Sequence, residues 1–173
     1  MRIGRSPLEC RLYIELHPCE CGGSIIDVRD RVVMREDTLC ALYTGRCSAC
    51  GHEREYMFVL GPEIVSPDAF GGANPSTIID AGQYLAASER AARQMRPVGP
   101  LEDRASARAS LGLAIACLDE VMKWIPPSEE SVPPSAFFTE EGLRVHADEP
   151  GRFRRTRLAA VLAAYREMWV RMS

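Results

Sequence analysis

Apolar and polar side chains alternate over several short stretches in the first third of the chain. Such alternation is typical of half-buried β-strands, because successive side chains of a strand point to opposite faces of its sheet. Charged or glycine-containing turns bound the stretches. The pattern predicts a small antiparallel sheet with strands over residues 12–16, 24–29, 31–34, 39–44 and 52–60.

Beyond residue 62 the apolar positions recur at the spacing of α-helices. We expect helices over residues 76–94, from about 100 to 125, and from about 152 to 172. Four prolines between residues 126 and 134 indicate an exposed connector, and residues 136–142 form a short apolar segment of undetermined structure. The stripes predict one helical core that includes Leu111, Ala114, Leu118, Val121, Ile125, Leu158, Leu162 and Tyr165.

The two patterns together predict an α+β fold. We expect a β module over residues 1–62, followed over residues 63–173 by a helical region of about three helices that packs on it as one unit. The chain has 173 residues, of which 46% are apolar, so it is long enough to build a core.

The charge is close to balanced in both parts. Residues 1–62 hold eight arginines against nine acids, and residues 63–173 hold thirteen basic residues against fifteen acids. Neither part carries the positive excess that binding to a phosphate backbone demands, so nucleic acid is an unfavoured partner.

The basic residues are arginines apart from Lys123, a bias that indicates a GC-rich bacterial genome. No apolar run has the length of a signal peptide or of a membrane span. We therefore expect a cytoplasmic protein that does not bind membranes.

Two close pairs of cysteines carry the clearest chemistry in the sequence. Cys19 and Cys21 form the first pair, and Cys47 and Cys50 form the second. In a reducing compartment such pairs bind metal more often than they form disulfides. Four thiolates from two tight turns can surround one Zn²⁺ and leave no open position for substrate, so the metal would be structural.

The second pair, followed by Gly51, resembles a knuckle of the zinc ribbon superfamily, in which cysteine turns at the ends of two hairpins hold one zinc. The first pair departs from that form, because one residue instead of two separates its cysteines. The resemblance covers residues 17–51 and implies a zinc-ribbon-like sheet. It implies that the zinc ligands are Cys19, Cys21, Cys47 and Cys50.

Two histidines lie two residues from these cysteines. The tight first turn leaves open a substitute ligand such as His17, but four cysteines already complete a shell. We therefore expect His17 and His52 to lie beside the ligands.

Signatures of catalysis are missing from the sequence. The segment around Cys19 is too short for a zinc deaminase, and only three histidines exist, none of them four residues apart as in metalloprotease helices. The glycines form no phosphate loop. Cys10, Cys40 and Cys117 are interpreted as small apolar fillers.

Exposed charged residues are the candidates for contact with a partner. Arginines at the start of the last expected helix are unfavourably placed relative to the helix dipole. They either bind an acidic group of another protein or form ion pairs with nearby acids of this chain. The candidate contacts are Glu53, Glu55, Asp148, Glu149, Arg152, Arg154 and Arg155.

These features favour a non-catalytic, zinc-stabilised bacterial module that binds another protein. Immunity proteins, which inhibit toxins, are small, acidic and soluble in the same way, so a toxin is the expected partner. The alternative is a zinc-ribbon protein that binds nucleic acid or assists transcription or translation, which the charge balance opposes.

Overall fold

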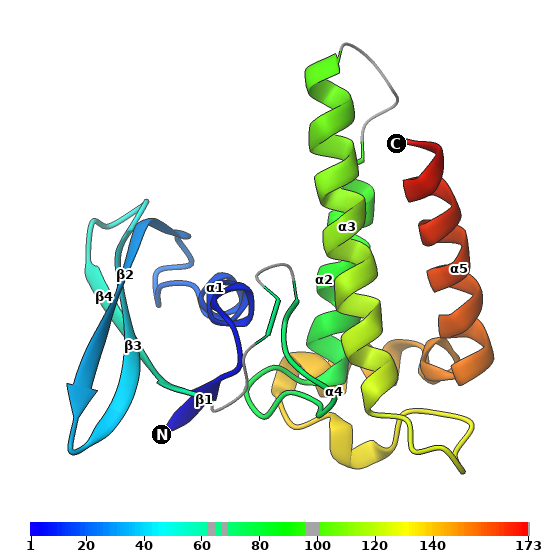
Figure 1. The fold of residues 1–173 in the computed structure, drawn as a ribbon, viewed down its shortest axis with the longest axis horizontal. Helices are drawn as coiled ribbons and strands as arrows, with labels where there is room; N and C mark the ends of the chain where they lie inside the picture. Colours follow the sequence, from blue (N-terminus) through cyan, green and yellow to red (C-terminus); the bar gives the residue numbers. More distant parts are fainter. Residues whose placement is uncertain (62–64, 67–68, 96–100, 173) are drawn as a thin grey trace. The chain divides into compact units, whose positions relative to one another are not determined.

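The computed structural model describes residues 1–61, 65–66, 69–95 and 101–172 (Figure 1). The chain divides into two compact units, one formed by Met1–Gly72 with Ser76–Ile78 and one by Ala73–Pro75 with Ile79–Ser173. The described residues form a four-stranded sheet and five α-helices, which confirms the α+β class with more helices than expected. The expected module boundary at residue 62 and the expected helix start at Pro100 lie outside the described residues.

The sheet of the N-terminal unit contains β1 (Arg2–Gly4), β2 (Ile25–Arg35), β3 (Thr38–Cys47) and β4 (Glu53–Leu60). Its strand order is β1-β4-β3-β2. The pairs β2–β3 and β3–β4 are antiparallel, as the pattern predicts, whereas the short β1 joins β4 in parallel. The two strands expected over residues 24–34 are one strand with a bulge, at which Asp27 has a φ of 53°.

The strand predicted over residues 12–16 is wrong, because these residues end the helix α1 (Pro7–Leu16). Ser6 caps the helix by accepting a hydrogen bond from the backbone N–H of Glu9, and Pro7 occupies its first turn. The consecutive side chains of Leu12, Tyr13 and Ile14 are all buried, as in a helix that packs on a sheet, and do not alternate between buried and exposed as in a half-buried strand. The helix start lies upstream of the segment from which the strand was predicted.

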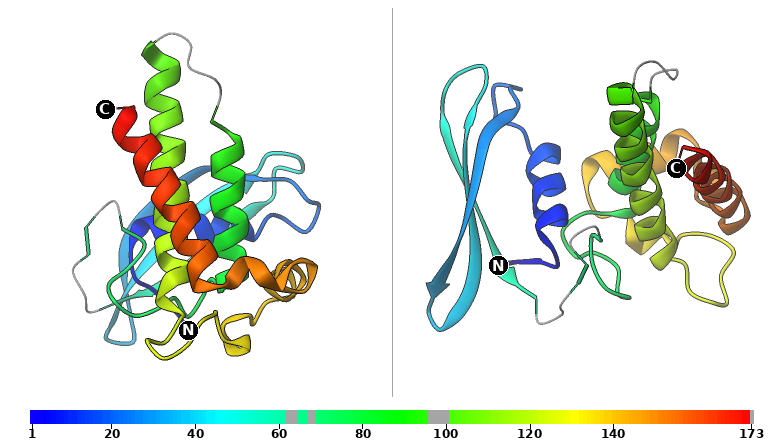
Figure 2. Two further views of the ribbon diagram at one scale, coloured as in Figure 1. Left: turned by 90° about the vertical axis from the view of Figure 1, so that its right-hand side faces the viewer. Right: turned by 45° about the horizontal axis from the view of Figure 1, so that its top comes forward.

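Helix α1 packs on one face of the sheet (Figure 2). The ring of Tyr13 meets that of Phe58 edge to face at 5.4 Å, and Phe58 meets Tyr43 in the same manner at 5.7 Å. Gly4 permits the close approach, because a Cβ there would lie 2.4 Å from the sulfur of Cys10. The opposite face of the sheet carries no described helix of this unit.

The C-terminal unit contains α2 (Ala81–Arg93), α3 (Leu101–Lys123), α4 (Glu140–Asp148) and α5 (Arg155–Arg171), with 3₁₀ turns η1 (Pro134–Ala136) and η2 (Pro150–Phe153). Helix α3 packs against α2 and α5, and α4 against α2. The predicted stripe of α3 is buried, as are Leu158 and Leu162 of α5, while Tyr165 is only half-buried.

The buried carboxylate of Asp80 joins α2 to α4. It caps α2 by accepting a hydrogen bond from the N–H of Gln83 at 2.9 Å. It also accepts bonds from the N–H of Phe138 at 3.1 Å and from the N–H and hydroxyl of Thr139 at 2.8 and 2.6 Å. Thr139 in turn caps α4. The segment of undetermined structure therefore contains the turn that starts a helix.

Candidate metal centre

The first cysteine pair lies in a tight turn between α1 and β2. The N–H of Gly22 donates to the carbonyl of Cys19 at 2.7 Å, and the N–H of Cys19 donates to the carbonyl of Gly23 at 3.0 Å. Gly22 has a φ of 83°, a left-handed conformation that glycine adopts without strain. The turn therefore closes although only one residue separates Cys19 from Cys21.

The second pair forms the turn between β3 and β4. The N–H of Gly51, whose φ is 72°, donates to the carbonyl of Cys47 at 3.0 Å. The N–H of Ala49 points at the sulfur of Cys47 from 3.4 Å. Each turn thus ends on a left-handed glycine that binds the carbonyl of its first cysteine, and the two differ by one residue in length.

Backbone contacts hold the two turns against each other. The N–H of Ser48 donates to the carbonyl of Ser24 at 2.9 Å. A Cβ on Gly23 would lie 2.5 Å from the sulfur of Cys47, which is below any normal contact distance. Gly23 is therefore needed for the close approach, a requirement that the sequence pattern alone does not disclose.

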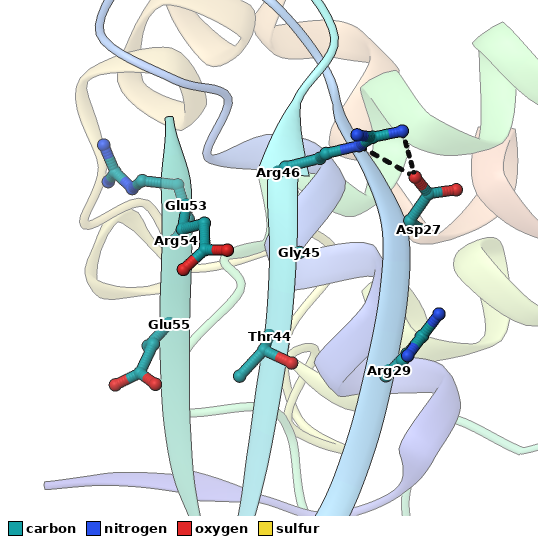
Figure 3. Close-up of a pocket in the computed structure, with 8 residues that line it drawn as sticks. All are labelled: Asp27, Arg29, Thr44, Gly45, Arg46, Glu53, Arg54 and Glu55. Atoms are coloured by element: carbon teal, nitrogen blue, oxygen red, sulfur yellow. Dashed lines mark hydrogen bonds and ion pairs between the residues drawn. The ribbon is translucent and has the colours of Figure 1, made fainter. Parts of the chain in front are cut away.

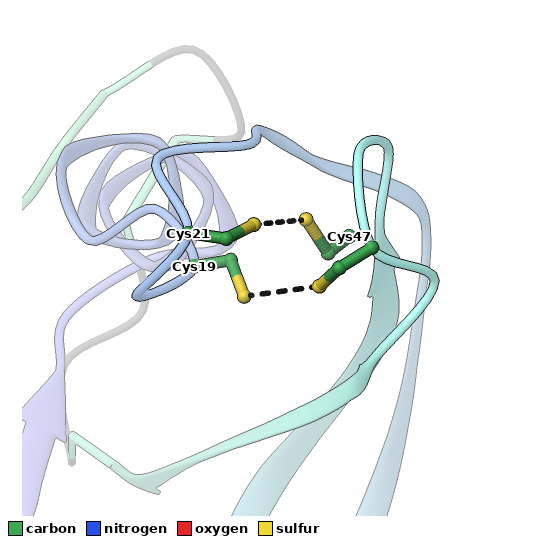
Figure 4. A group of neighbouring side chains, drawn as sticks. Cys19, Cys21 and Cys47 are labelled. Atoms are coloured by element: carbon green, nitrogen blue, oxygen red, sulfur yellow. Dashed lines mark hydrogen bonds between the residues drawn. The ribbon is translucent and has the colours of Figure 1, made fainter.

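The four sulfurs gather around one point (Figure 4). All lie within 4.8 Å of one another, with 3.4 Å between Cys21 and Cys47 and 3.7 Å between Cys19 and Cys50. Sulfurs bound to one tetrahedral Zn²⁺ at about 2.3 Å are about 3.8 Å apart, whereas a disulfide is about 2.05 Å long. The four cysteines could therefore bind a metal.

Backbone amides polarise this group. The N–H groups of Cys50 and Ala49 lower the pKa of Cys47 from 9.0 to about 6. The N–H of His52 acts to lower the pKa of Cys50, but hydrogen bonds with the other three cysteines raise it to about 12. The thiolate of Cys47 is stabilised while Cys50 keeps its proton, because two adjacent negative charges repel. A bound divalent cation would remove this repulsion between thiolates by replacing their protons.

The group is reachable from solvent on one side. Cys19 and Cys47 are 6% and 2% exposed, while Cys21 and Cys50 are exposed. A shallow depression of about 460 Å³ lies over the sulfurs, and Glu20, His52 and Arg54 contribute to its lining. A chelator can therefore reach a bound ion without unfolding the unit.

The two histidines lie outside the four-sulfur group. His17 ends α1, where its Nδ1 lies 2.7 Å from the carbonyl of Tyr13 and its ring stacks on that of Tyr13 at 3.8 Å. His52 is exposed and accepts the N–H of Cys47 at its carbonyl, at 2.9 Å. Both positions suit residues that support the turns.

The other predicted site residues fall into two separate places. Glu53 and Glu55 are exposed on β4, where they line an open depression of about 500 Å³ with residues of β2 and β3 (Figure 3). The remaining candidates belong to the C-terminal unit. The structure thus gathers no single site from all of them.

The candidates of the C-terminal unit mostly have partners within it. Asp148 pairs with Arg144, Glu149 with Arg157, and Arg152 with Glu89. The guanidinium of Arg155 donates to the carbonyls of Pro126 and Glu129 at 2.6 and 3.0 Å, and so fixes the proline-rich connector. Arg154 is exposed at the start of α5.

The three remaining cysteines are buried thiols. Burial raises the pKa of Cys10 to about 12, which leaves it protonated and unreactive near neutral pH. Cys40 and Cys117 are both 0% exposed.

Comparison with protein families, with curated proteins and with solved structures finds no match for this chain. Among the described residues, no helix combines the length and the apolar character that crossing a membrane requires.

Proposed function

We propose that this chain is a non-catalytic protein-binding module whose N-terminal unit is held together by one structural Zn²⁺. The observation that carries the proposal is the convergence of four sulfurs from two turns. A shell of four cysteines is one of the established kinds of structural zinc site, and it leaves no position open for water or substrate.

Zinc is the metal that this donor set supports best. Four thiolates in a tetrahedron select Zn²⁺ or iron–sulfur chemistry over calcium and magnesium, which prefer oxygen ligands. The separations of 3.4 and 3.7 Å are close to those around one small ion. Zinc there would link the turn after α1 to the turn between β3 and β4, and its binding energy would be folding energy.

A protein partner is supported by the surface of the sheet. The face opposite α1 bears the exposed carboxylates of Glu53 and Glu55. No ion pair joins either residue to another of the described residues. Acidic side chains that lack internal partners fit a basic protein, because complementary charge speeds encounter and fixes orientation. We propose a toxin as that partner and an inhibitory role in the bacterial cytoplasm.

The metal part of the proposal is tested by native mass spectrometry of the purified chain. We expect one zinc per chain, and its loss in Cys47→Ser and Cys50→Ser together with unfolding of the N-terminal unit. The matched control is Cys40→Ser, which changes a buried cysteine outside the group and should keep the zinc. A fully folded chain without metal would contradict the proposal.

The partner part is tested by pull-down from the native host, with Glu53→Arg/Glu55→Arg as the comparison. We expect a protein encoded by a neighbouring gene to be recovered with the wild type and lost with the variant. Tight, salt-sensitive binding to RNA or DNA without any protein partner would favour the alternative of a nucleic-acid-binding role.

A further inference from the structure

The face of the sheet opposite α1 is organised in rows that cross three strands. Phe58 points toward α1, because its ring contacts Tyr13. Its neighbours Met57 and Val59 therefore point to the opposite face, and strand pairing extends that face across β3 to β2. The rows are Arg29–Thr44–Glu55, Arg31–Leu42–Met57 and Val33–Cys40–Val59.

The rows change in character along the strands. Near the cysteine turns the face is charged, with Arg29 on one flank of Thr44 and Glu55 on the other (Figure 3). Toward the β2–β3 hairpin, beyond the exposed Arg31, the row Val33–Cys40–Val59 is apolar. Its valines are half-buried and Cys40 between them is 0% exposed, while Ile3 of the neighbouring strand β1 is 45% exposed beside Val59. Arg29 and Glu55 are both exposed, and no ion pair joins either to another of the described residues.

We propose that this face pairs with the same face of a second copy of the chain, about a two-fold axis that runs along β3. The inference builds on the proposed function, since it names the occupant of the protein-binding face when the other partner is absent. A two-fold interface brings the same surface patch of both copies together, so the patch must complement itself.

The direction of the axis follows from the rows. Rotation about an axis along β3 keeps the position of each row along the strands and reverses the order of the strands across the sheet. Strand β2 of one copy therefore lies over β4 of the other. Arg29 then faces Glu55 of the second copy, and Val33 faces Val59 of the second copy. An axis perpendicular to the strands would instead place the charged end on the apolar end and leave charges unpaired.

The second charged row fits the same axis. Within one chain Arg46 leans toward Asp27 and pairs with it at 2.9 Å (Figure 3). Rotation about β3 brings Glu53 of the second copy over Asp27, within the region that Arg46 occupies. The cation of Arg46 therefore lies between two carboxylates, one from each copy. The two sheets would stack as an aligned sandwich.

The size of the face sets the expected strength. Three strands about 4.8 Å apart and seven paired rows about 3.4 Å apart give a flat area of roughly 14 Å by 24 Å. The faces of two copies together bury roughly 700 Å², which is below the size of stable specific interfaces, so we expect a weak, transient dimer with a dissociation constant in the upper micromolar range.

Sedimentation equilibrium of the zinc-loaded full chain between about 10 and 300 µM tests the inference across the concentration range that micromolar affinity requires. We expect a monomer–dimer equilibrium. Arg29→Glu or Glu55→Arg should each raise the dissociation constant roughly tenfold, because the two-fold axis turns two attractions into two repulsions. The double variant Arg29→Glu/Glu55→Arg should restore the wild-type value within about threefold, since its charges match again.

The control is Glu15→Arg, which makes the same charge change on α1, on the other side of the sheet, and should leave dimerisation unaltered. A wild type that stays monomeric throughout the range, a control that weakens the dimer as much as Glu55→Arg, or a double variant without recovery would each overturn the inference. Zinc content measured on the same samples separates these outcomes from a failure of the proposed metal centre.

Discussion

Replacing Asp80 with alanine removes the one acceptor that serves the start of two helices. Its carboxylate takes hydrogen bonds from three backbone N–H groups and one hydroxyl, and its side chain is 0% exposed. Loss of the cap of α2 costs about 0.5–2 kcal/mol. The N–H groups of Phe138 and Thr139 lose their acceptor as well, at about 1–1.5 kcal/mol each. We expect the free energy of unfolding of the helical unit to fall by about 3–5 kcal/mol.

Urea unfolding followed by tryptophan fluorescence measures this change, because Trp124 and Trp169 are the only tryptophans and both belong to the helical unit. Asp80→Asn should cost less than Asp80→Ala, since its amide oxygen still accepts one bond. The control is Asp119→Ala, an exposed residue paired with Arg166, which should change stability by less than about 0.5 kcal/mol. A loss below about 1 kcal/mol in Asp80→Ala would refute the reasoning, since a buried acceptor of four bonds cannot be so dispensable.

Three further predictions concern the metal turns and the helical core. Gly23→Ala should weaken zinc binding in a competition assay with a chromophoric chelator, because its Cβ would lie 2.5 Å from the sulfur of Cys47, whereas Ser48→Ala in an exposed position should not. Bound zinc needs deprotonated thiols, and the N–H groups of Cys50 and Ala49 lower the pKa of Cys47 from 9.0 to about 6, so zinc should be retained at neutral pH and released as the pH falls below about 6; zinc content measured after gel filtration at stepped pH checks this, and zinc retained far below that pH would contradict it. Leu118→Ala, at a side chain 1% exposed, should reduce the unfolding free energy by about 2–5 kcal/mol in urea, and a loss below about 0.5 kcal/mol would mean that its surroundings are misassigned.

The four candidate metal ligands were predictable because each pair of cysteines is local. A turn of four or five residues places both of its cysteines, so spacing alone indicates a ligand pair. The stripe of α3 was predictable for a similar reason: Leu111, Leu118 and Val121 lie on one side of a helix whatever surrounds it.

The errors arose where local pattern and tertiary contact compete. Residues 12–16 have a strand-like composition, yet the cap at Ser6 and burial against Phe58 make them helical. Thr139 gave little local sign of a helix, because α4 is short and its cap is held by Asp80, 59 residues away.

The sequence by itself determined the element types over most of the chain, the α+β class and the identity of the candidate metal ligands, since each depends on neighbours within a few positions. Only the tertiary structure decided that the two cysteine turns meet, that Gly23 must be small, and that Arg29 and Glu55 share a row. These facts depend on strand register and on contacts between distant segments. Register is set by the packing of a whole sheet face, which no short stretch of sequence contains.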